Sequence, residues 1–187
     1  MPRIALAALA LCAAQFFPSA PALAQTQSFD RGHVHVITSA DPKRLDFAVT
    51  VPATLDQVWE AFTTVPGVTS WLAPEAAVEL RPGGKWEVSF GPGSSTAGGT
   101  IELVQPRSLL AISAMAPDRF PTVRRERTDA VFLFEAAGPN ATLVRLTQTG
   151  WKQGAEWDAA FSYLAGGNAE LLEALYHRFA VGPMRWK

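Results

Sequence analysis

Two side-chain amides are the polar groups of this sequence best placed to orient a small molecule. Gln148 continues the face of Val144 and Leu146 in residues 142–149, which alternate as in a strand. Asn168 falls in the centre of the apolar stripe of a long helical segment. Small-molecule pockets are typically apolar and aromatic, with a few polar groups that fix orientation. We therefore expect both amides to anchor a ligand, each hydrogen-bonded as buried polar groups must be.

An apolar lining is expected around these amides from the sheet, the long helix and two short helices. Its predicted members are Phe62, Trp71, Trp86, Val88, Phe90, Phe132, Phe134, Trp157, Phe161 and Leu164. Two alternatives stay open. The aromatic residues can simply fill the core, and Asn168 can be a structural residue bonded to the backbone of a helix that Gly166 and Gly167 interrupt.

Motifs of known enzymatic chemistry are sparse. Residues 91–99 are rich in glycine, but no Gly-Lys-Ser/Thr follows, so they are interpreted as a flexible loop at a pocket mouth and not as a phosphate site. Ser94 and Ser95 lack the elbow pattern of a hydrolase nucleophile. Glu102 and Asp158 are the acids to which an enzymatic role could be assigned, and the sequence identifies no catalytic residue beyond them.

Metal and anion sites are also weakly supported. His33 and His35 would share one face of a short strand, as metal ligands sometimes do, but there is no convincing third ligand. We expect neither a metal nor a cofactor. Arg124, Arg125 and Arg127 are interpreted as a solvated loop, with an anion site as the alternative.

The N-terminus has the features of an export signal. Arg3 precedes an apolar run over residues 4–17, and Ala22-Leu23-Ala24 matches the A-x-A cleavage pattern. The run is shorter than the roughly 20 residues that a membrane span needs. Residues 1–24 are thus predicted to be a signal peptide, and the mature protein to be periplasmic or secreted. Cys12 lies within this segment, so the mature chain can form no disulfide.

The remaining chain predicts one domain with no basic field. The formal net charge is −1, which gives no support for binding nucleic acid or an anionic membrane. Residues 25–44 form a polar lead-in, and residues 45–181 form the domain. Within it, Thr54 and Gln57 make a capping box that starts a short helix.

Antiparallel strands and one long helix are the elements that must position the pocket. Seven strands are expected, at residues 45–51, 78–80, 85–90, 100–105, 109–115, 128–136 and 142–149. Their short connections make consecutive strands antiparallel neighbours. Residues 156–179 are the only segment long and apolar enough to cover one face of this sheet. The predicted class is α+β, a curved antiparallel sheet gripping a C-terminal helix.

Four stretches resemble a known superfamily. They are VPATLDQVWEAFTT, WLAPEAAVELRPGGKWEV, LVRLTQTGW and EWDAAFSYLAGGNAELLEALYHRF. Over residues 45–179 the chain is similar to the START-like helix-grip (SRPBCC) superfamily, in the branch named after the activator of the heat-shock-protein ATPase. The resemblance implies a seven-stranded sheet and a cavity between sheet and helix that holds an apolar ligand in many relatives. Relatives often carry a bulky aromatic residue where this chain has Asn168.

The resemblance does not imply one activity, because the superfamily includes carriers, cyclases, hydrolases and chaperone cofactors. The function expected is an exported protein that binds a small apolar or aromatic molecule. The first alternative is a cyclase- or hydrolase-type enzyme that uses the same cavity. The second is a protein-interaction module of the chaperone-cofactor kind, which export disfavours because the chaperone after which the branch is named is cytosolic and uses ATP.

Overall fold

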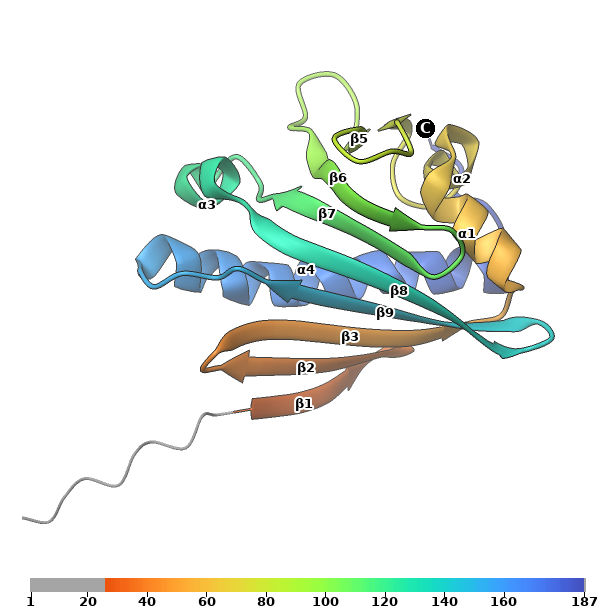
Figure 1. The fold of residues 1–187 in the computed structure, drawn as a ribbon, viewed down its shortest axis with the longest axis horizontal. Coiled ribbons are helices and arrows are strands. Elements are labelled where there is room, and N and C mark those ends of the chain that lie inside the picture. The colour runs from red at the N-terminus through yellow and green to blue at the C-terminus, as the bar shows by residue number, and fades with distance from the viewer. Residues whose placement is uncertain (1–25, 187) are drawn as a thin grey trace, which may run out of the picture.

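The structure is a computed structural model that describes residues 26–186 (Figure 1). The predicted signal peptide lies outside the described residues. Between residues 26 and 186, no helix is both long and apolar enough to cross a membrane.

One antiparallel sheet of nine strands forms the framework, in the spatial order β1-β2-β3-β9-β8-β7-β6-β5-β4 (Figure 1). Every neighbouring pair is consecutive in sequence except β3 and β9, which join the two ends of the domain. The strands are β1 Thr26–Arg31, β2 Val34–Ala40, β3 Lys43–Val51, β4 Glu75–Val78, β5 Lys85–Ser89, β6 Ala97–Gln105, β7 Leu109–Met115, β8 Thr128–Gly138 and β9 Ala141–Thr149. The predicted α+β class with a long C-terminal helix is confirmed.

The strand count exceeds the predicted seven because the polar lead-in forms the hairpin β1–β2 and extends the sheet beyond β3. Val34 and Val36 of β2 are fully buried, which gives the hairpin an apolar side. All residues of β1 are exposed, so that strand has no alternation by which the sequence could reveal it.

A carboxylate on the long helix also holds this hairpin. Glu173 Oε2 accepts a hydrogen bond from the His33 backbone N–H at 2.8 Å, and its Oε1 lies 2.8 Å from His33 Nδ1. The His33 ring stacks on Tyr176, with ring centroids 3.6 Å apart. Gly32 permits this approach, because its φ is +61° and a Cβ there would lie 2.6 Å from the Glu173 carboxyl group.

Four helices accompany the sheet: α1 Leu55–Thr63, α2 Val65–Thr69, α3 Pro121–Glu126 and α4 Ala155–Ala180. The capping box at α1 is as predicted: Thr54 Oγ1 accepts from Gln57 N–H at 3.3 Å, and Gln57 Oε1 accepts from Thr54 N–H at 3.0 Å. Helix α3 includes Arg124 and Arg125, which were predicted to lie in a solvated loop. It begins at Pro121, a residue whose fixed φ suits the first helical position.

Helix α4 runs for 26 residues along the sheet and is continuous through Gly166 and Gly167 (Figure 1). The predicted interruption is therefore absent. A Cβ on Gly166 would lie 3.0 Å from Arg31 Nη1, so this glycine faces the N-terminal hairpin. A Cβ on Gly167 would meet no atom within 4 Å.

Two hydrophobic clusters hold the two ends of α4. Ala169, Leu172 and Leu175 belong to the main core with the sheet, α1 and α2. Trp157 and Ala160 belong to a smaller cluster whose other buried members are Ala116, Phe120 and Val123, around α3. The middle of the helix, between these two anchored ends, is the part that borders the pocket described next.

Candidate functional site

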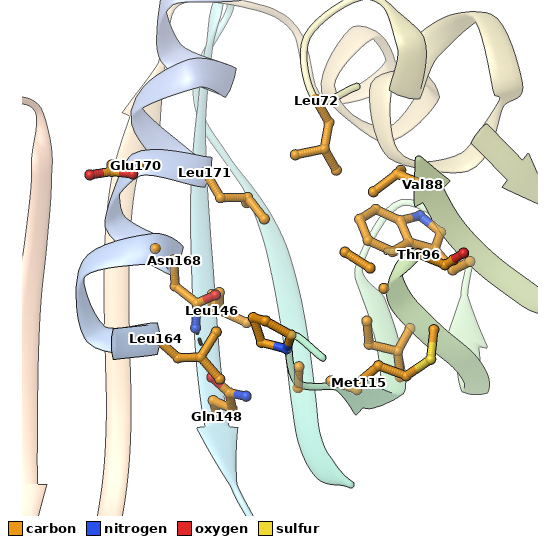
Figure 2. Close-up of a pocket in the computed structure, with 18 of the residues that line it drawn as sticks. Leu72, Val88, Thr96, Met115, Leu146, Gln148, Leu164, Asn168, Glu170 and Leu171 are labelled. Carbon is orange, nitrogen blue, oxygen red and sulfur yellow. Dashed lines mark hydrogen bonds between the residues drawn. The ribbon is translucent and has the colours of Figure 1, made fainter. Parts of the chain in front are cut away.

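A pocket of about 520 Å³ lies between the middle of α4 and the inner face of β5–β9 (Figure 2). Most of its lining side chains are aliphatic or aromatic, and they come from every layer of the fold. The lining residues are Leu72, Trp86, Val88, Phe90, Ser94, Ser95, Thr96, Ala97, Gly98, Ile112, Ala114, Met115, Pro117, Ala130, Phe132, Leu146, Gln148, Tyr163, Leu164, Gly167, Asn168, Glu170, Leu171 and Ala174.

More than half of the residues proposed from sequence lie in this lining: Trp86, Val88, Phe90, Phe132, Gln148, Leu164 and Asn168. Two simple periodicities in the sequence predicted the directions of these side chains. Alternation along a strand puts Trp86 and Val88 on the same face, and helical spacing puts Leu164 and Asn168 one turn apart.

Three of the proposed residues lie outside the pocket, in the main core. The Phe62 ring centroid lies 5.1 Å from that of Trp71 and 5.0 Å from that of Phe134. The indole N–H groups are satisfied there, since Trp71 Nε1 donates to Ala61 O at 3.0 Å. Helices α1 and α2 cover this end of the sheet, so these rings fill space between helix and sheet.

Two more proposed residues, Trp157 and Phe161, lie too near the N-terminal end of α4 to reach the pocket. They pack around Trp151, whose ring centroid is 6.4 Å from that of Trp157 and 5.1 Å from that of Phe161. Helical spacing identified the correct side of the helix. It could not identify which turns lie opposite the pocket.

Several lining residues were not proposed from sequence. Ile112 and Ala114 alternate on β7, and Leu171 belongs to the predicted apolar stripe of α4. Those signals were present and could have found them. Leu72 and Tyr163 carry no such signal, because one follows α2 and the other is an exposed helical position.

The two amides meet inside the fold. Asn168 Nδ2 donates to Gln148 Oε1 at 2.7 Å, and Gln148 Nε2 donates to Thr128 Oγ1 at 2.7 Å (Figure 2 draws the first of these bonds). Gln148 and Thr128 are buried, whereas Asn168 is half-buried at the pocket wall. Asn168 is thus bonded to a side chain of β9 and not to the backbone beside Gly166 and Gly167.

Among the described residues, the pocket wall carries no charge that points inward. Glu170 is the only charged residue of this described lining, and its exposed carboxylate pairs with Arg31 Nη2 at 2.5 Å. Figure 2 shows Glu170 directed away from the other lining side chains. The two acids considered for catalysis lie elsewhere: Glu102 is exposed on β6, and Asp158 pairs with Lys43.

Part of the glycine-rich segment lies at the pocket, whereas its last residues, 97–99, belong to β6 and not to a loop. Phe90, which is 55% exposed, and Ser94 to Thr96 belong to the lining. Ser94 closes the loop, because its hydroxyl accepts from Phe90 N–H at 3.0 Å and donates to Gly91 O at 2.7 Å. Gly91 and Gly93 have φ values of +119° and +80°, which the turn requires.

The other groups singled out in the sequence have structural partners. Ser28 Oγ and Asp30 Oδ1 contact His35 at 3.1 and 2.7 Å, and within residues 26–186 no cluster of three metal-ligating side chains is present. Arg124 pairs with Asp118 at 2.9 Å.

Arg127 differs from these groups: its φ is +68°, and its Nη1 is buried without a hydrogen-bond partner among the described residues. Burial, and then the Arg124 charge, lower the pKa of Arg127, while Glu87 opposes them.

A carboxylate outside the pocket joins α4 to α3. Glu156 Oε1 accepts from the backbone N–H groups of Thr122 and Val123, at 2.6 and 3.0 Å, at the start of α3. Burial alone would raise the pKa of Glu156. The hydrogen bonds from Val123 and Thr122 and the Arg125 charge outweigh burial, so the pKa is lowered.

Solved structures share this fold. A dimeric Aha1 from Colwellia psychrerythraea is 17% identical, with a TM-score of 0.60 over 74% of this chain and 97% of the other. DynU16, from the dynemicin biosynthetic locus, is 20% identical, with a TM-score of 0.60 over 75% of this chain and 48% of the other. CalU16 from Micromonospora echinospora is 18% identical, with a TM-score of 0.57 over 86% of each chain.

Sequence comparison assigns the family. No curated protein was found to match the chain. The family model described as Activator of Hsp90 ATPase homolog 1-like protein matches residues 52–180, which is more than half of the sequence. This range includes α1 to α4 and every strand that borders the pocket. The chain belongs to the family of Activator of Hsp90 ATPase homolog 1-like proteins.

Proposed function

We propose that this protein binds a small, uncharged and largely apolar molecule between α4 and the sheet. The observation that carries the proposal is the pocket itself. Its volume of about 520 Å³ falls within the range of small-molecule sites, and its apolar wall contains one accessible amide, that of Asn168.

The apolar wall supplies the affinity in this proposal. Each 100 Å² of apolar ligand surface removed from water contributes about 2.5 kcal/mol. Micromolar affinity corresponds to about 8 kcal/mol, so a ligand the size of two or three fused rings could reach it after the cost of immobilisation. The absence of an inward charge among the described lining residues favours neutral molecules over ions.

Binding without turnover is the better-supported form of this function. An acid–base enzyme needs a titratable group within hydrogen-bonding reach of the reacting atom. The carboxylate of Glu170 is instead paired with Arg31, and Glu102 and Asp158 lie outside the lining. The described residues therefore provide a ligand with an apolar surface to pack against and one amide to hydrogen-bond.

Export is part of the same proposal. Its support is the apolar run followed by Ala22-Leu23-Ala24. N-terminal sequencing of the protein recovered from outside the cytoplasm should begin at Gln25 or within a few residues of it. Recovery of only the full-length chain from the cytoplasm would contradict export.

A variant that fills the pocket tests binding. Gly167 lines the pocket and has free space where a Cβ would stand, so Gly167→Phe should place a ring in the pocket. Ala159→Phe is the matched control, because Ala159 is exposed on the same helix. In a fluorescence titration with the tricyclic hydrocarbon fluorene, wild type and Ala159→Phe should bind alike and Gly167→Phe at least tenfold more weakly. Equal binding by all three would place the ligand elsewhere.

A further inference from the structure

The amide pair forms a hydrogen-bonded chain of three side chains that ends at a hydroxyl. The chain runs from Asn168 at the pocket wall to Gln148 and then to Thr128. Gln148 and Thr128 are 3% and 2% exposed, so Asn168 is the member that a ligand can reach. The directions of the hydrogen bonds among these three side chains therefore determine whether Asn168 presents a donor or an acceptor to the pocket.

This chain has two possible directions. Each amide can turn by 180° about its terminal torsion, which exchanges its oxygen and nitrogen, and a threonine hydroxyl can rotate. In the first direction, Asn168 Nδ2 donates to Gln148 and Gln148 Nε2 donates to Thr128 Oγ1, each at 2.7 Å. Asn168 Oδ1 then faces outward as an acceptor. In the second direction, Thr128 donates to Gln148 Oε1, Gln148 Nε2 donates to Asn168 Oδ1, and Asn168 Nδ2 faces outward as a donor.

The Thr128 hydroxyl decides between them. Among residues 26–186, Gln148 is its only side-chain or backbone hydrogen-bonding partner. In the first direction Thr128 only accepts, so its own O–H is buried with nothing to donate to. In the second direction that O–H donates to Gln148 Oε1. One N–H of the Gln148 amide then remains the only donor of the two buried side chains without a partner among the described residues, one fewer than in the first direction. Unmade buried donors are strongly avoided in proteins, which favours the second direction.

We propose that the pocket selects molecules that carry a hydrogen-bond acceptor of the carbonyl type, which takes a hydrogen bond from Asn168 Nδ2. This inference rests on the proposed binding function and adds a chemical class to it. The acceptor is neutral, because the only charged residue in the described lining, Glu170, is directed outward and paired with Arg31. A ketone, quinone or amide oxygen on an apolar ring system fits; a molecule whose only polar group is an N–H does not.

Three rigid tricyclic probes of nearly equal shape separate these cases. Fluorene has no polar group, 9-fluorenone has one acceptor, and carbazole has one N–H donor. With the wild-type mature protein, fluorenone should bind about three- to tenfold more tightly than fluorene, the effect of one additional neutral hydrogen bond. Carbazole should bind no better than fluorene. In Asn168→Leu the three dissociation constants should converge.

The wild-type ranking alone tests the inference, so it stands or falls even if the variant does not fold. Tightest binding by carbazole, or equal binding of all three by the wild type, would overturn the proposed direction while leaving the binding function intact. If none of the three probes binds, the binding function fails for apolar molecules, and the inference fails with it.

Discussion

The side-chain amides of Asn168 on α4 and Gln148 on β9 are hydrogen-bonded to each other across 2.7 Å, and this bond joins the helix to the sheet at the pocket wall. Residues 20 positions apart in sequence thereby share a polar contact beside a largely apolar pocket wall. In the proposed function this contact is also available to a ligand, because Gln148 is buried whereas Asn168 is half-buried at the pocket wall.

This pairing predicts coupling between the two amides. Asn168→Leu leaves buried Gln148 with an unmet hydrogen-bonding group, so it should lower the free energy of unfolding by about 1–2 kcal/mol. Gln148→Met should cost a similar amount. The double variant should cost less than the sum of the two, and urea unfolding of all four proteins gives the coupling energy. Strict additivity would mean that the bond contributes nothing to stability.

The glycine at position 167 is predicted to lower the free energy of unfolding while it leaves free space at the pocket wall. Alanine there meets no neighbour within 4 Å, so Gly167→Ala should stabilise the protein by about 1 kcal/mol through helix propensity. Gly166→Ala is the matched comparison. Its Cβ would lie 3.0 Å from Arg31 Nη1, so the arginine must shift and the gain should be smaller. Thermal unfolding measures both, and a larger gain at Gly166 would contradict the assigned roles.

Arg127 has a strained backbone conformation. Its φ of +68° and ψ of +165° fall in a region that glycine adopts far more readily than other residues. Arg127→Gly should therefore stabilise the protein by about 1 kcal/mol, and it also removes the buried Nη1 that lacks a partner.

Arg107→Gly is the control for this change, because Arg107 also has a positive φ, of 63°, but is exposed and paired with Asp56 at 2.7 Å. It should gain less than Arg127→Gly. A loss of stability in Arg127→Gly would show that the arginine stem packs well enough to outweigh the strain.

The Glu156 contact predicts a pH dependence on the acid side. The folded state lowers the pKa of Glu156, so its contribution to stability is complete above the ordinary pKa of a glutamate. It is lost as the pH falls through the lower pKa of the folded state. Urea midpoints at pH 7 and pH 3.5 should therefore differ less in Glu156→Gln than in the wild type. An unchanged pH difference would mean that the carboxylate charge at the start of α3 is not used.

The sequence predicted those parts of the fold that depend on local periodicity. The capping box at Thr54 and Gln57 and the long helix follow from spacing along one segment, and both are present. The contact between Gln148 and Asn168 could also be predicted from the sequence, because each amide interrupts an otherwise apolar face. Two faces that must pack together bring their polar positions together as well.

The parts that were missed depend on which segments lie opposite one another. Strand β1 is exposed throughout, so no alternation marks it. Trp157 and Phe161 share the side of α4 that Leu164 occupies, yet both pack against Trp151, and Trp157 also belongs to the cluster around α3. Phe132 and Phe134 share one strand face and both pack against Phe62 of α1, yet Phe132 lines the pocket and Phe134 does not. Periodicity gives the direction of a side chain and not its distance from the pocket.

Native mass spectrometry of the freshly purified mature protein tests the central claim most directly. The account predicts a co-purified or added neutral molecule bound at one per chain, which Gly167→Phe releases and Ala159→Phe retains. A ligand retained equally by both variants, or no bound species even after incubation with fluorene and fluorenone, would contradict the claim that this pocket is a binding site.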